Sequence, residues 1–311
     1  MPLLKFSDVN LHKASLAIID KANAIIAEYQ QQGLDLTLRQ LYYQFVARGF
    51  LPNNDREYKK LGNTIANARL AGLIDWEAIV DRTRFLREQP HWKSPVQIID
   101  ACAAQFRLDK WMTQPNYVEV WIEKDALIGV IETVCQQNDV PYLACRGYAS
   151  ASEVWEAGYV RMRRRVKAKK QCVVLYLGDH DPSGLDMTRD VQERLDLFAG
   201  QAGAVEVRRL ALNIEQVQQY NPPPNPTKMT DSRASNSNGT GYVERFGLEC
   251  WELDALNPTI IRDLIQAELD QLIDRKQWAK AEAEEQAGKG QLAAIVERWD
   301  DVCSAIAEDG A

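Results

Sequence analysis

Two short acidic stretches carry side chains that could do chemistry. Residues 173–187 read VVLYLGDHDPSGLDM, in which an apolar run leads directly into Asp179 and Asp181. Residues 117–123 read YVEVWIE and end in Glu123 just before a helix-like segment. In a sheet with helices on its faces, functional groups gather where strands end and helices begin. If the two strands are neighbours, we expect the three carboxylates to converge at one edge of the sheet.

Three clustered carboxylates repel one another unless a positive charge lies among them. Oxygen ligands without a histidine or thiol cluster favour a hard cation such as Mg²⁺, which neutralises charge on phosphate oxygens in phosphoryl chemistry. The alternative is that Asp-x-Asp-Pro-x-Gly simply forms a turn. Glu123 at the end of an earlier strand favours the metal. His180 lies between the two aspartates, and strand alternation turns it away from them, so it is given no ligand role.

The chain changes its pattern near Pro115. Before it, three short helices are predicted over residues 9–33, 37–47 and 56–72, with Thr37 as an N-cap and residues 73–84 as a short strand or wing. This is typical of a helix-turn-helix type of domain. After it, strands and helices alternate up to residue 212, which predicts a largely parallel sheet. We expect an α/β protein with domains at 1–112 and 113–311, a long loop at 221–241 and a helical tail.

Composition narrows the class of protein. The 311 residues carry a net charge of −7, which argues mildly against non-specific coating of nucleic acid but leaves room for a basic groove. No apolar run approaches the roughly 18 residues of a membrane-spanning helix, and we expect neither a secretory signal nor a membrane partner. The six cysteines are scattered without CxxC spacing, which indicates reduced thiols in a cytoplasmic protein, and the three histidines make zinc an unfavoured metal.

The acidic motifs resemble those of a known family. IEKDALIGVI (residues 122–131) and GDHDPSGLDM (residues 178–187) are similar to the TOPRIM domain of the topoisomerase VI A subunit and of the related meiotic double-strand-break transesterases. CRGYAS (residues 145–150) resembles the glycine segment between these motifs, although Ala149 and Ser150 stand where that family has Pro-Asp. The resemblance implies a Rossmann-like TOPRIM fold in which Glu123, Asp179 and Asp181 hold Mg²⁺.

The same resemblance bears on RQLYY, residues 39–43. In that family a winged-helix (CAP-like) domain carries the nucleophile as the second residue of a Tyr-Tyr pair in an Arg-x-x-Tyr-Tyr context, which implies Tyr43. Helical spacing places Arg39 and Tyr43 on one face, whereas Tyr42 lies about 100° around the helix and is expected to point into the core. A guanidinium beside a phenol can bind a phosphate and favour the phenolate. Alternatively, both tyrosines are packing aromatics.

Together these features predict Mg²⁺-dependent cleavage of double-stranded DNA through a phosphotyrosyl link, as in a topoisomerase (an isomerase). The resemblance implies a homodimer in which the tyrosine of one protomer works with the metal of the other to make a double-strand break. The chain has no Walker A motif, so strand passage would need a separate ATPase subunit. Two alternatives remain: a TOPRIM nuclease that uses activated water, and a non-catalytic DNA-binding module. We expect a cytoplasmic location, with the nucleoid as its site in a prokaryote.

Basic residues suggest where DNA would lie. Residues 161–170, RMRRRVKAKK, hold seven basic side chains and predict a phosphate-tracking surface, or else a solvated helix end. Within the 221–241 loop, Lys228 and Arg233 are the charges that would favour DNA. The pair of acids in ELDAL, residues 252–256, is attributed to capping of the next helix. The candidate DNA contacts are Arg56, Lys59, Lys60, Arg69, Arg161, Arg163, Arg164, Arg165 and Lys167.

Overall fold

A computed structural model describes residues 3–81, 89–236 and 238–309. The chain forms two compact units. The first combines Met1–Arg84 with Val118–Glu268, and the second combines Phe85–Tyr117 with Leu269–Ala311. The first unit therefore contains both the N-terminal helices and the α/β sheet that the sequence predicts.

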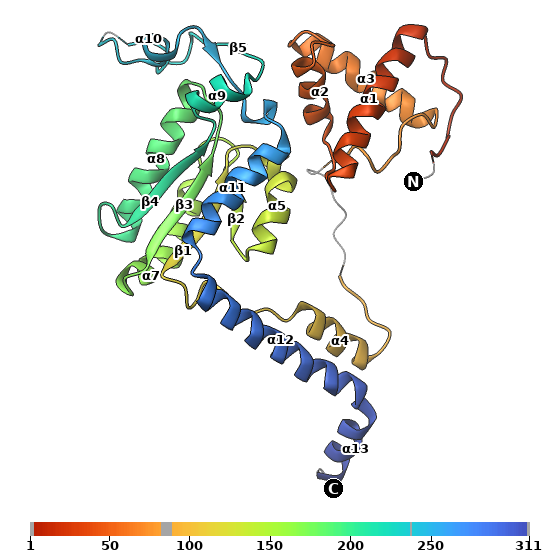
Figure 1. Ribbon diagram of the computed structural model, residues 1–311, viewed down its shortest axis with the longest axis vertical. Helices are drawn as coiled ribbons and strands as arrows, with labels where there is room; N and C mark the ends of the chain where they lie inside the picture. Colours follow the sequence, from red (N-terminus) through yellow and green to blue (C-terminus); the bar gives the residue numbers. More distant parts are fainter. Residues whose placement is uncertain (1–2, 82–88, 237, 310–311) are drawn as a thin grey trace. The chain divides into compact units, whose positions relative to one another are not determined.

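Three helices form the N-terminal part of the first unit: α1 (Lys13–Gln31), α2 (Leu38–Ala47) and α3 (Asp55–Leu70). Their apolar faces share one buried core (Figure 1). Thr37 caps α2 as predicted. Its hydroxyl accepts a hydrogen bond from the backbone N–H of Gln40 at 3.2 Å, while the Gln40 side chain accepts one from the backbone N–H of Thr37 at 2.8 Å. This capping box determines where α2 begins.

The short strand expected within residues 73–84 is not formed in the described part of that segment. A single isolated bridge joins Ile79 to Leu36, and residues 82–84 lie outside the described residues. The carbonyl groups of Trp76 and Ile79 accept hydrogen bonds from the Arg69 guanidinium. This side chain therefore ties the segment to α3.

A four-stranded parallel sheet forms the centre of the α/β part, in the order β2-β1-β3-β4 (Figure 1). Its strands are β1 (Asn116–Ile122), β2 (Tyr142–Ala144), β3 (Gln171–Leu177) and β4 (Val205–Ala211). The sequence prediction of a parallel sheet is confirmed. Residues 172–177 of β3 are fully buried, as expected for a strand with helices on both faces.

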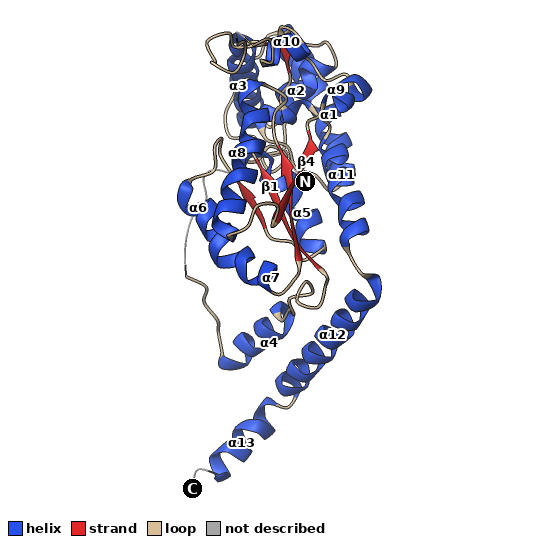
Figure 2. Cartoon of the chain, turned by 90° about the vertical axis from the view of Figure 1, so that its left-hand side faces the viewer, coloured by secondary structure: helices blue, strands red, loops and turns tan. Residues whose placement is uncertain are grey.

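Helices cover both faces of the sheet (Figure 2). One face carries α5 (Ile128–Gln137), which follows the short 3₁₀ turn η1 (Asp125–Leu127), and α11 (Pro258–Leu272). The other face carries α8 (Pro182–Ala199) and the predicted basic helix. That helix consists of α6 (Ala151–Trp155), a π-helical segment η2 (Glu156–Met162) and α7 (Arg163–Lys167).

The predicted 221–241 loop is mostly irregular, but it is anchored to the body. Within it, β5 (Asn225–Pro226) pairs antiparallel with β6 (Glu249–Cys250), and Ala234 is fully buried. Arg233 forms an ion pair with Asp186 at 3.1 Å. The flanking elements are α9 (Ile214–Tyr220), α10 (Tyr242–Phe246) and the 3₁₀ turn η3 (Leu253–Ala255).

The second unit is helical, consisting of α4 (Pro95–Gln105), α12 (Arg275–Glu297) and α13 (Trp299–Asp309). Trp111 packs edge-to-face on Trp278, with ring centroids 5.8 Å apart. Phe106 lies against Gly288, where an added Cβ would overlap the ring. Among the described residues, none of the helices combines the length and apolar character needed to cross a membrane.

Candidate active site

The carboxylates predicted from the sequence lie together at the carboxyl edge of the sheet. Glu123 continues the β1–β3 ladder, because its backbone N–H donates to the carbonyl oxygen of Leu177 at 2.8 Å. The Glu123 Oε2 atom accepts a hydrogen bond from the backbone N–H of Asp179 at 2.9 Å. Asp181 follows in the same turn. Neighbouring parallel strands therefore bring residues 123 and 179 together, as the pattern predicts.

The turn after β3 is held by Arg209, a partly buried residue on β4 that the sequence pattern did not single out. Its guanidinium donates to the carbonyl oxygens of Gly178 at 3.0 Å, Asp179 at 2.6 Å and Gly184 at 3.0 Å. A Cβ at Gly184 would overlap the carbonyl oxygen of Asp179. The Asp181 carboxylate caps α8 by accepting from the N–H of Gly184 at 2.6 Å. The Asp-x-Asp segment therefore forms a turn stabilised by hydrogen bonds, and the same turn carries the acidic side chains.

Helix α2 places Arg39 and Tyr43 beside this edge of the sheet. Arg39 Nη2 lies 3.3 Å from the Tyr43 hydroxyl, which confirms the predicted shared face. Tyr43 donates its hydroxyl proton to Glu252 Oε2. Tyr42 points elsewhere: its hydroxyl contacts the carbonyl oxygen of Pro52 at 3.0 Å and accepts from the N–H of Asn54 at 2.7 Å. The two hydroxyls therefore have different partners, as expected. The rings themselves lie 5.6 Å apart, both are 4% exposed in the same buried core, and both residues line the same cavity.

Three further charged residues complete the site: Lys124, Glu252 and Asp254. Lys124 Nζ lies 2.9 Å from Asp179 Oδ2, 3.0 Å from Glu252 Oε2 and 2.8 Å from Asp254 Oδ1. On the other side, Arg39 contacts Glu252 through Nη2 at 2.8 Å and Asp254 through Nε at 3.0 Å. Arg39 and Lys124 therefore both bind Glu252 and Asp254, which follow the strands of the sheet in the sequence.

The capping interpretation of ELDAL was wrong. The Asn257 side chain caps the first turn of α11 by accepting from the N–H of Thr259 at 2.9 Å. Glu252 and Asp254 are left to pair with cations more than a hundred positions earlier in the chain. Lys124 directly follows Glu123 in the sequence, and that adjacency was the available signal for it. The two acids of ELDAL, one residue apart, resemble Asp179 and Asp181 in their spacing. The helix that begins just after them led to the capping interpretation instead.

Burial and mutual charge shift the ionisation of the site. Burial, aided by Glu123, raises the pKa of Asp179 to about 7 against the opposing attraction of Lys124. Burial also raises the pKa of Tyr43, and the negative charges of Asp254 and Glu252 add to that effect. The pKa of Glu252 falls to about 2 although burial opposes it, because Lys124, Tyr43 and Arg39 stabilise its charged form. Tyr43 is therefore held as a neutral phenol facing an ionised carboxylate.

These groups line one cavity of about 770 Å³, which includes Arg39, Tyr43, Glu123, Lys124, Asp179, Asp181 and Glu252. In the described chain, no three His, Cys, Asp or Glu side chains are arranged as a metal-binding group. The donor chemistry nevertheless suits a hard cation, because the candidate ligands are all carboxylates. The described residues provide no hydrogen bond to Glu123 Oε1 or Asp181 Oδ2, whereas Asp179 already binds Lys124 and the N–H of Leu253. Glu123 and Asp181 thus each keep a carboxylate oxygen that could bind such a cation.

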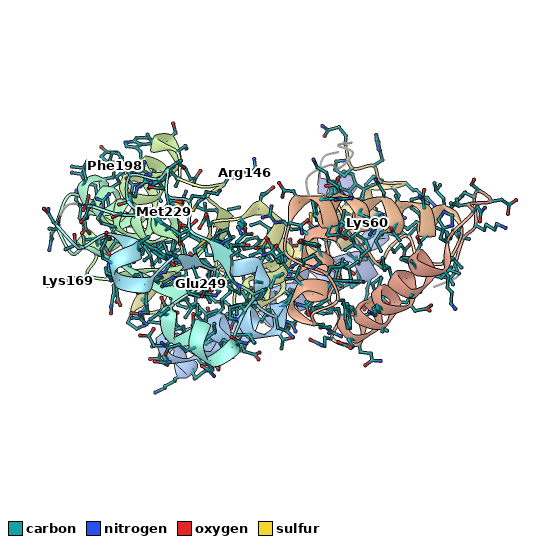
Figure 3. All side chains as sticks on the ribbon, turned by 90° about the horizontal axis from the view of Figure 1, so that it is seen from above. Lys60, Arg146, Lys169, Phe198, Met229 and Glu249 are labelled. Carbon is teal, nitrogen blue, oxygen red and sulfur yellow. The ribbon has the colours of Figure 1, made fainter. Side chains whose placement is uncertain are left out.

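The candidate DNA contacts fall into two groups. Arg56, Lys59 and Lys60 are exposed on α3, as are Arg164 and Lys167 on α7; Lys60, which is labelled in Figure 3, also lies 3.6 Å from Glu57 on its own helix. The others have contacts within the protein. Arg161 binds Glu119 at 2.8 Å and Glu153 at 3.2 Å.

The remaining members of the second group also have partners within the protein. Arg163 lies over the ring of Tyr159, Arg165 donates to the carbonyl oxygen of Arg161 at 2.6 Å, and Arg69 binds the carbonyl groups described above. The second group therefore has structural partners within the chain. The predicted basic surface is therefore narrower than its sequence suggests.

No protein-family model matches this chain, and no curated protein matches it in sequence. The resemblance to the topoisomerase VI A subunit therefore rests on the short motifs alone. Any functional conclusion has to come from the geometry of the site.

Proposed function

We propose that this protein cleaves double-stranded DNA by transesterification, with Tyr43 as the nucleophile. One observation carries the proposal: the hydroxyl of Tyr43, with Arg39 at 3.3 Å, lines the same cavity as Glu123, Asp179 and Asp181. A phenol, a guanidinium and a carboxylate cluster in one cavity are the parts that cleavage of a phosphodiester by tyrosine requires.

In the reaction, the Tyr43 oxygen forms a bond to phosphorus and the bond from phosphorus to a sugar oxygen breaks. The phenolic proton leaves Tyr43 and the departing sugar oxygen gains one proton, so the exchange releases no net proton. Arg39 stabilises negative charge on the phosphate oxygens as the bonds exchange. The phosphotyrosyl link retains the energy of the broken bond, so the reverse step rejoins the strand without another energy source.

Mg²⁺ is the proposed cofactor, held by Glu123 and Asp181 with Asp179 beside them. When bound, such an ion neutralises charge on phosphate oxygens. Asp179 takes part through Lys124, which it holds at 2.9 Å.

We extend the proposal to a homodimer that makes a double-strand break, and to strand passage only with a separate ATPase subunit. A single chain already brings Tyr43 and the carboxylates to one cavity. Cleavage within one protomer is thus compatible with the geometry, and the exchange of tyrosines across a dimer remains a prediction. All six cysteines are free thiols, in keeping with a proposed cytoplasmic location.

The test is to trap the covalent complex. The protein is mixed with a labelled duplex and Mg²⁺, denatured with detergent, and examined for DNA that migrates with the protein. We expect an adduct from the wild type and from Tyr42→Phe, and none from Tyr43→Phe. Tyr42→Phe is the matched control because it removes a hydroxyl from the adjacent ring. An adduct that persists in Tyr43→Phe would contradict the proposal.

One observation favours a second function, hydrolysis of DNA by water on the same carboxylates. Tyr43 donates its proton to Glu252 and its pKa is raised, which disfavours the phenolate. A nuclease of this kind would leave no adduct, would keep its cleavage activity in Tyr43→Phe, and would lose it in Asp179→Ala. The same set of variants therefore separates the two chemistries. A wild type that neither cleaves DNA nor binds Mg²⁺ would be a non-catalytic binding module.

A further inference from the structure

Glu252 occupies an unusual position in the cavity. A single oxygen of Glu252, Oε2, lies 2.8 Å from Arg39 Nη2 and 3.0 Å from Lys124 Nζ. The same oxygen accepts a hydrogen bond from the Tyr43 hydroxyl. A guanidinium, an ammonium and a hydroxyl that converge on one anionic oxygen form the set of donors that recognises a phosphate oxygen. Here they are satisfied by a carboxylate of the protein itself.

The two cations have a second carboxylate partner besides Glu252. Asp254 lies beneath them, 2% exposed, and binds Arg39 Nε at 3.0 Å and Lys124 Nζ at 2.8 Å. Asp179 adds a second hold on Lys124 at 2.9 Å. Glu252 differs from Asp254 because a quarter of its side chain is exposed and it lines the cavity. It can therefore leave without removing the support of Arg39 and Lys124.

We propose that Arg39, Lys124 and the Tyr43 hydroxyl form a subsite for one non-bridging oxygen of a DNA phosphodiester, and that the Glu252 carboxylate holds this place until DNA displaces it. Lys124 is then a substrate-binding residue, and Glu252 is an internal competitor of the substrate. Displacement also removes the hydrogen-bond acceptor of the Tyr43 hydroxyl, whereas the burial of Tyr43 and the charge of Asp254 remain. The inference rests on the proposed function for the identity of the ligand as DNA.

The test measures DNA binding without chemistry. Affinity for a fluorescent duplex oligonucleotide is measured by anisotropy in the presence of EDTA. Glu252→Gln keeps the shape of the side chain and removes the competing charge, so we expect the duplex to bind roughly tenfold more tightly. Glu249→Gln is the matched control. Glu249 (labelled in Figure 3) is exposed, lies three residues before Glu252 in the sequence and carries the same charge. We expect it to change the affinity less than twofold.

A paired variant tests the subsite itself. Removing Lys124 would leave Asp179 and Asp254 facing each other without that cation, so the pair uses Arg39→Gln, whose parent side chain is half exposed. Adding Arg39→Gln to Glu252→Gln should abolish the tenfold gain. Equal gains from Glu252→Gln and Glu249→Gln, or weaker binding by Glu252→Gln, would overturn the inference.

The two proposals fail separately. If the wild type forms no covalent adduct but Glu252→Gln binds DNA tenfold more tightly, the phosphate subsite stands and the transesterase does not. If the adduct forms and the two glutamine variants bind DNA alike, the transesterase stands and the subsite does not.

Discussion

At the scale of single residues, Asp254 and Glu252 show how burial separates two acids of one short motif. Asp254 is almost completely inaccessible and contacts both Arg39 and Lys124, whereas Glu252 is partly open to the cavity. Breaking a buried ion pair on one side leaves a charge that the interior cannot solvate. A partly exposed pair loses less, because water replaces the missing partner.

We therefore expect Asp254→Ala to lower the free energy of unfolding by about 3 kcal/mol. Glu252→Gln should lower it by less than about 1 kcal/mol. Urea denaturation of the metal-free protein at pH 7 measures both. Similar losses from the two variants would show that burial does not distinguish these carboxylates.

At the scale of elements, α2 presents Arg39 and Tyr43 from its first two turns. The reciprocal hydrogen bonds between Thr37 and Gln40 determine where the helix starts and hence which way these side chains point. On the sheet, the partly buried Arg209 binds the turn that carries Asp179 and Asp181. Two local devices, a cap and a bridged turn, thus position groups that are far apart in the sequence.

The cap can be tested directly. Thr37→Ala removes the acceptor for the N–H of Gln40 and should lower the free energy of unfolding by about 1 kcal/mol. Thr37→Ser keeps a hydroxyl at the same place and should remain within about 0.5 kcal/mol of the wild type. Denaturation curves of the three proteins decide the point, and an equal effect of serine and alanine would rule out the hydroxyl as the cause.

At the scale of the whole molecule, the second unit is held together by its own buried acid. Glu285 on α12 is 4% exposed and binds Lys289 at 2.9 Å, the N–H of Leu108 at 3.0 Å and Lys110 at 3.4 Å. Burial opposes its charge, but these partners prevail and lower its pKa to about 2 from an ordinary 4.5. Its stabilising effect should therefore be complete above pH 4.5 and decline as the pH falls toward 2.

Glu285→Gln should lower the free energy of unfolding by about 2 kcal/mol at pH 7, and the difference from the wild type should narrow at pH 3. Unfolding is followed by tryptophan fluorescence, to which Trp111 and Trp278 of this unit contribute. Glu284→Gln is the control, because Glu284 is exposed and its ion pair with Lys280 is long, at 4.0 Å. A difference that does not change with pH would mean that Glu285 acts by packing alone.

The sequence by itself determined the features that depend on neighbouring positions. Alternation of apolar runs and helical segments predicted the parallel sheet, Thr37 predicted the start of α2, and the spacing of Arg39 and Tyr43 predicted their shared face. These signals are local, because hydrogen bonding and side-chain direction repeat over a few residues. In the described part of residues 73–84, expected to form a short strand or wing, the structure has a single bridge from Ile79 to Leu36. Arg69 of α3 binds two carbonyl groups of this segment, a contact that a local pattern does not report.

Only the tertiary structure decided what surrounds Tyr43. Lys124, Glu252 and Asp254 meet across more than a hundred positions, and Arg209 reaches the turn at Asp179 from the next strand. A charged residue looks the same in sequence whether it caps a helix, faces solvent or binds an opposite charge. Its role follows from which partners burial brings within about 3 Å, and that depends on the packing of the whole first unit.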